Sequence, residues 1–112
     1  MKRVSLGGRV RVSRLTGRCP HRFNYLLHKG DVDVINLSVG GPDFADEPFG
    51  DKVKEVVASG ITLVSAMGND GPAYGTLNAP GDAVEVIGVG ASEADSGRVA
   101  AISSRGLSLI HI

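Results

Sequence analysis

The chain contains one asparagine whose position in the sequence suits chemistry on a carbonyl group. Asn69 follows a mostly apolar stretch, residues 61–67, and lies between Gly68 and the turn-forming residues 70–72. No strand or helix continues through that sequence, so we expect Asn69 at the carboxyl end of a strand, where ligand sites gather in α/β proteins. Its side-chain amide can donate a hydrogen bond to an oxygen atom that becomes negative during a reaction.

A second predicted strand ends in the same way earlier in the chain. Residues 34–39 are a largely β-branched run that stops at the Gly-Gly-Pro sequence of residues 40–42. Two parallel strands that both end in glycine leave a cleft where another backbone can approach closely, and residues 38–40 could bind an extended peptide by strand addition. The alternative is that Asn69 only stabilises a turn, and spacing alone favours this alternative because Asn-Asp-Gly-Pro is a good turn sequence.

The residues between these strands predict a helix that would hold both strand ends in place. Within residues 43–60, Asp46 can cap the helix, Pro48 suits its first turn and Gly60 follows its last. A strand, a helix and a strand in this order make a βαβ unit with parallel strands and a right-handed crossover. The apolar face of the helix consists of Phe49, Val53, Val56 and Val57.

Weaker patterns complete the expected α/β fold. Residues 23–29 form a short helix, residues 84–89 a third strand and residues 99–102 a short fourth strand. The prediction is a parallel sheet of three to four strands and two helices built on a βαβ core. Two helices are too few to cover such apolar strands on both faces, so we expect exposed edges that are prone to aggregation.

Composition excludes several classes of site. A length of 112 residues suits one domain, and no apolar run approaches the roughly 18 residues that cross a bilayer. The single cysteine, Cys19, excludes an internal disulfide and a cysteine-based metal site. Residues 88–90 (Gly-Val-Gly) lack the third glycine of a dinucleotide-binding loop, so no cofactor is expected.

Residues 1–22 differ in charge from the rest of the chain. They carry seven lysine and arginine residues and no acidic residue, although the formal net charge of the whole chain is zero. Arginines and glycines interrupt the apolar core of a signal peptide and weaken the amphipathic helix of a transit peptide. Aromatic residues for base stacking are missing, so no nucleic acid partner is expected. The favoured interpretation is a basic leader that is disordered or non-native.

Two separated motifs resemble the middle of a subtilisin-like serine protease. They are DVINLSVGGP at residues 33–42 and SAMGNDGP at residues 65–72, with the predicted helix between them. The longer string GNDGPAYGTLNAP at residues 68–80 is similar to the branch of the family that cleaves membrane-bound transcription factor precursors. Membership of that branch implies a protein of the secretory pathway (ER or Golgi). It also implies that this chain is a fragment of a three-layer α/β fold. The resemblance covers residues 23–106, the central part of a catalytic domain, and leaves residues 107–112 as an unrelated tail.

The resemblance assigns Asn69 as the side-chain donor of the oxyanion hole. It implies an extended peptide or protein as the partner, and no metal or other cofactor. Met67 would change the shape of the pocket for the residue before the scissile bond. Two groups of three residues would form the walls of that pocket: Ser38, Val39 and Gly40, which also pair with the substrate backbone, and Ala66, Met67 and Gly68 on the other side.

The catalytic triad of this family has no counterpart in the sequence. The H-G and G-T-S motifs that carry the histidine and serine are absent, and His21, His28 and His111 lie in other contexts. The nucleophile and the base dominate the rate of a triad mechanism, so we expect the chain alone to be inactive, with the remainder of the catalytic domain missing. The alternative is a non-catalytic peptide-binding module of the subtilase fold.

Overall fold

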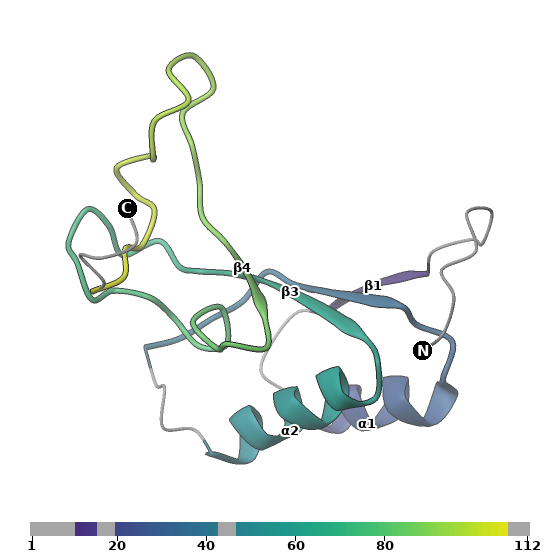
Figure 1. The fold of residues 1–112 in the computed structure, drawn as a ribbon. Helices are drawn as coiled ribbons and strands as arrows, with labels where there is room; N and C mark the ends of the chain where they lie inside the picture. Colours follow the sequence, from purple (N-terminus) through teal and green to yellow (C-terminus); the bar gives the residue numbers. More distant parts are fainter. Residues whose placement is uncertain (1–10, 16–19, 43–46, 108–112) are drawn as a thin grey trace.

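The computed structural model describes residues 11–15, 20–42 and 47–107. Helices and strands alternate along the chain through the first five elements, as in two successive βαβ units (Figure 1). In the described part of the chain, no helix is long and apolar enough to cross a membrane. The elements are β1 (Val12–Leu15), α1 (Pro20–Lys29), β2 (Val34–Leu37), α2 (Glu47–Ala58), β3 (Thr62–Ala66) and β4 (Ile87–Val89).

The four strands form one parallel sheet in the order β1-β2-β3-β4. Val34 lies opposite Thr62, and Val64 lies opposite Ile87, so the carboxyl ends of β2, β3 and β4 meet at one edge. Both helices lie on the same face of the sheet in Figure 1, as successive right-handed crossovers to the next strand require. The predicted parallel sheet with two helices is confirmed.

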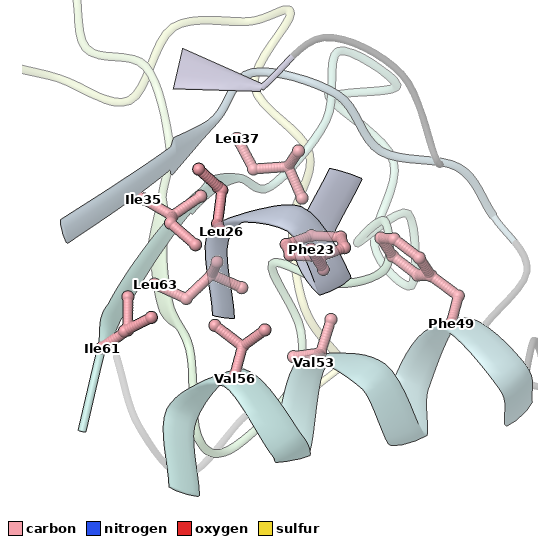
Figure 2. Packing of buried hydrophobic residues seen from close by; sticks show 9 residues of the cluster. All are labelled: Phe23, Leu26, Ile35, Leu37, Phe49, Val53, Val56, Ile61 and Leu63. Atoms are coloured by element: carbon pink, nitrogen blue, oxygen red, sulfur yellow. The ribbon is translucent and has the colours of Figure 1, made fainter. Parts of the chain in front are cut away.

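The core lies between the sheet and the two helices (Figure 2). Alternate residues of β2 are buried: Ile35 and Leu37 face the helices, whereas Asn36 is exposed on the opposite face. Phe23 of α1 packs against Phe49 of α2, with ring centroids 5.9 Å apart. The apolar face predicted for the second helix is therefore the face that packs on the sheet. The buried cluster comprises Phe23, Leu26, Ile35, Leu37, Phe49, Val53, Val56, Ile61 and Leu63.

One strand lies within the region that the sequence suggested as a disordered or non-native leader. β1 pairs with β2 from Val12 opposite Val34 to Leu15 opposite Leu37. The first helix also begins at Pro20, three residues before the expected boundary. Among the described residues β1 is an edge strand, and a strand that pairs on one side only carries less of the apolar pattern that reveals an inner strand. Residues 1–10 and 16–19 lie outside the described residues.

The last part of the predicted sheet also differs from the structure. β4 is limited to Ile87–Val89 because residues 80–86 form hydrogen-bonded turns. Residues 99–102 form no strand, and Val99 makes only an isolated antiparallel bridge with Ser92, so β1 supplies the fourth strand. The described helices cover one face of the sheet, and the third layer of the expected three-layer arrangement is not part of the described residues.

Candidate functional site

The segments that follow β2 and β3 border an open hollow at the carboxyl edge of the sheet. The two strands end in register, with Leu37 opposite Ser65. The hollow has a volume of about 380 Å³ and lies on the face opposite the helices, since Asn36 and Val64 of that face line it. Residues 89–91, at the end of β4, complete its lining.

Asn78 and Ala79 close the space between the two strand-end segments. The Asn78 amide N–H donates to the carbonyl oxygen of Met67 at 2.9 Å. Gly41 and Ala79 exchange two backbone hydrogen bonds, with N···O distances of 3.2 and 2.9 Å. Residues 38–41 and 66–68 therefore form the two sides of a slot whose far end is closed by backbone.

The backbone of residues 38–40 is available for pairing with another chain. Beyond the strand ladders, which end at Leu37, no backbone hydrogen bond joins Val39 or Gly40 to another of the described residues. Ser38 and Gly40 are exposed, and Val39 is half-buried. This segment thus presents the unpaired backbone groups that strand addition of an extended peptide requires.

Asn69 lies exposed at the rim of the hollow, on a loop that is fixed from both sides. The Asp70 carboxylate accepts a hydrogen bond from the side-chain amide of Asn78 at 2.9 Å. The Gly71 amide donates to the carbonyl oxygen of Ile102 at 3.0 Å. The loop is therefore held by distant parts of the chain, and Asn69 on this loop lines the hollow.

The structure brings four of the seven predicted site residues to the hollow: Ser38, Ala66, Gly68 and Asn69 line it. Val39, Gly40 and Met67 do not line it. The side chain of Met67 lies beside Gly88, where an added Cβ would stand 3.1 Å from the Met67 Cγ. Met67 therefore points toward β4 and not into the hollow, although its backbone belongs to the slot. The functional roles of these residues remain predictions.

Sequence reasoning missed the residues that hold this site together. Asn78 and Ser104 are buried polar residues, and each bonds to the loop that carries Asn69. In the sequence, Asn78 and Ser104 are polar residues near glycines, and this pattern does not predict which distant residue each one bonds to. His21 and His28 are exposed on α1, in the helical layer, and His111 lies outside the described residues. No group of three potential metal ligands occurs among the described residues.

Comparisons with known proteins match this part of the chain to peptidases. The model of the Subtilase family matches residues 16–111, a longer span than the predicted 23–106. Subtilisin-like protease SBT6.1 of Arabidopsis thaliana is 57% identical over 86 residues, which cover 77% of this chain and 8% of the relative. Membrane-bound transcription factor site-1 protease of Homo sapiens is 55% identical over 85 residues, covering 76% of this chain and 8% of the relative.

Solved structures agree with the sequence matches. The S41 psychrophilic protease has a TM-score of 0.65 at 30% identity and covers 77% of this chain and 29% of its own. Sphericase has a TM-score of 0.64 at 29% identity and covers 76% of this chain and 28% of its own. The similarity thus extends to the arrangement of the sheet and helices, and this chain spans only a small share of each relative.

Proposed function

The chain belongs to the subtilase family of serine peptidases, and on that premise we propose that it carries the peptide cleft and the oxyanion donor of an endopeptidase. The resemblance to the branch that contains site-1 protease is confirmed by the identity of 55% to the human protein. The chain spans about 8% of the length of these relatives, so peptidase activity is proposed for a complete protein. The observation that carries the proposal is that Asn69 lines a hollow that Ser38, the residue after β2, lines as well.

The proposed cleft binds its substrate through the backbone. An extended peptide pairs with residues 38–40, in which the backbone groups of Val39 and Gly40 bond to no other backbone group of the described residues. The side chain before the scissile bond enters the slot that Asn78 and Ala79 close. The scissile carbonyl then lies on the side of Asn69, and main-chain pairing fixes its direction.

Asn69 would act when the carbonyl oxygen becomes an anion. Attack of a serine hydroxyl on the carbonyl carbon moves an electron pair onto the oxygen, and the Asn69 amide donates a hydrogen bond to it. The nucleophile and its base come from outside the motifs of this chain, so we expect no hydrolysis by the 112 residues alone. For the complete protein, relationship to the site-1 protease branch supports the secretory pathway as its compartment.

The test uses a chimeric protease: complete SBT6.1 of Arabidopsis thaliana in which the matched 86-residue segment is replaced by that of this chain. Asn69→Ala should lower kcat by ~10²–10³ with little change in KM, a magnitude known for the equivalent donor of subtilisin itself and carried over here. Asn24→Ala makes the same chemical change on the exposed side of α1 and should leave kcat within about twofold of wild type. An unchanged kcat in Asn69→Ala would remove the assigned role and favour a non-catalytic peptide-binding module.

A further inference from the structure

Ser104 bonds to the backbone on both sides of Asn69. Its amide N–H donates to the carbonyl oxygen of Gly68 at 3.2 Å. Its Oγ accepts a hydrogen bond from the amide N–H of Asp70 at 3.0 Å, across 34 positions of sequence. One residue thus holds the two peptide units that flank the proposed oxyanion donor.

The contact is partly buried and leaves little room for adjustment. Ser104 is 5% exposed. A Cβ added at Gly68 would stand 2.6 Å from the Ser104 Oγ, so the backbone and the hydroxyl already lie as close as a glycine allows. A partly buried hydrogen bond in such a packed setting fixes its two partners relative to each other.

Asn69 depends on this backbone support because its side chain has no hydrogen bond of its own to another described residue. Within the described part of the chain, no hydrogen bond joins the Asn69 side chain to another residue. An oxyanion donor is effective when it is positioned before the charge develops, and a displacement of about 1 Å can cost ~10² in rate. The orientation of Asn69 must therefore come from its backbone.

We infer that Ser104 is a positioning residue that orients Asn69 for catalysis, an inference that rests on the proposed function. The neighbouring Ser103 provides a matched comparison. Ser103 is 1% exposed, and its Oγ accepts a hydrogen bond from the amide N–H of Ala91 at 3.0 Å, at the end of β4. The two serines have the same chemistry and burial, but only Ser104 holds the loop that carries Asn69.

The experiment is a double-mutant cycle in the chimeric protease. Ser104→Ala should lower kcat at least about tenfold, with KM within about twofold, and should have no further effect when Asn69 is already alanine. Ser103→Ala, by contrast, should have the same effect in both backgrounds. Ser104→Cys keeps the size of the side chain but weakens its acceptor, so an intermediate loss of kcat is expected.

Three outcomes separate the two proposals. An unchanged kcat in Asn69→Ala defeats the proposed function itself. A large loss in Asn69→Ala together with an additive loss in Ser104→Ala overturns the role of Ser104 and leaves that of Asn69 intact. If Ser104→Ala fails to fold, Ser104→Cys is used in its place. Its circular dichroism spectrum shows whether it is folded, and a folded Ser104→Cys variant with the kcat of wild type also overturns the inference.

Discussion

Gly40 lies directly against Asn78, which closes the end of the slot between the two strand-end segments. A Cβ added at Gly40 would stand 3.0 Å from the Cβ of Asn78 and 3.2 Å from the carbonyl oxygen of Ala79. The carbonyl oxygen of Ala66, on the opposite side of the slot, would be 3.8 Å away. The close approach of Asn78 and Ala79 to the 38–41 segment therefore depends on the absence of a side chain at Gly40.

We predict that Gly40→Ala narrows the slot and changes the preference of the chimeric protease. The added methyl group occupies space that a large side chain before the scissile bond would need. The value of kcat/KM for a peptide with leucine at that position should fall at least about tenfold relative to a peptide with alanine there. The measurement is the ratio of kcat/KM for the two peptides, for Gly40→Ala and for wild type.

Gly50→Ala is the control for this prediction. Gly50 lies in α2, and an added Cβ there meets no atom within 4 Å. The ratio of the two kcat/KM values should stay at that of wild type. Equal losses for both peptides in Gly40→Ala would mean general damage to the site and would contradict a narrowed slot.

A second prediction concerns the glycine that precedes Asn69. Gly68 has a φ of 113°, and a Cβ there would collide with the Asn78 amide and the Ser104 hydroxyl. Gly68→Ala should lower the free energy of unfolding by more than about 3 kcal/mol, because backbone strain and steric overlap add. Gly60 has a φ of 90° with nothing within 4 Å, so Gly60→Ala should cost only about 1–2 kcal/mol. Urea unfolding of the chain, below the concentration at which it associates, compares the two; equal losses would contradict this prediction.

The parts of the fold that the sequence predicted are those in which local signals agree. Residues 34–39 and 61–67 combine β-branched residues with glycine punctuation, and Gly60 ends the helix between them, so β2, α2 and β3 were recognised. Val12–Leu15 lies among arginines and glycines, and within the described residues it pairs only with β2, so neither composition nor alternation revealed β1.

The residues of the candidate site also divide into those that local sequence signals predicted and those that they did not. Asn69 and Ser38 follow strands directly, so chain order alone places them at the carboxyl edge of the sheet. Asn78 and Ser104 reach the Asn69 loop through tertiary hydrogen bonds across 8 and 34 positions of sequence. Such contacts depend on how loops fold back on the sheet, and no local periodicity encodes them.

A third prediction uses the helical glycine as a site of stabilisation. Gly50 lies in α2, where glycine costs backbone entropy relative to alanine, and no neighbour obstructs a methyl group. Gly50→Ala should therefore raise the free energy of unfolding by about 0.5–1 kcal/mol, measured by urea unfolding of the 112-residue chain. A decrease would show that the open space beside Gly50 is needed for packing.

A fourth prediction concerns the uncovered face of the sheet. Ile87 and Val89 of β4 are 55% and 50% exposed, and their register places them on the same face as Val64, opposite the helices. Within the described residues β4 is also an edge strand, so its apolar face and unpaired backbone groups favour association between copies of the chain. Ile87→Lys should lower the apparent mass of the 112-residue chain in light scattering at a given concentration, because a lysine opposes both contacts.

The control for Ile87→Lys is a lysine at Val99. Val99 is 58% exposed, similar to Ile87, but lies outside the four-stranded sheet on a loop with a single bridge to Ser92. Val99→Lys adds the same charge without touching the edge of the sheet, so the apparent mass should stay close to that of wild type. A purified wild-type chain that remains monomeric at all concentrations would contradict the prediction. It would show that the exposed apolar face and edge of β4 cause no association between copies of the chain.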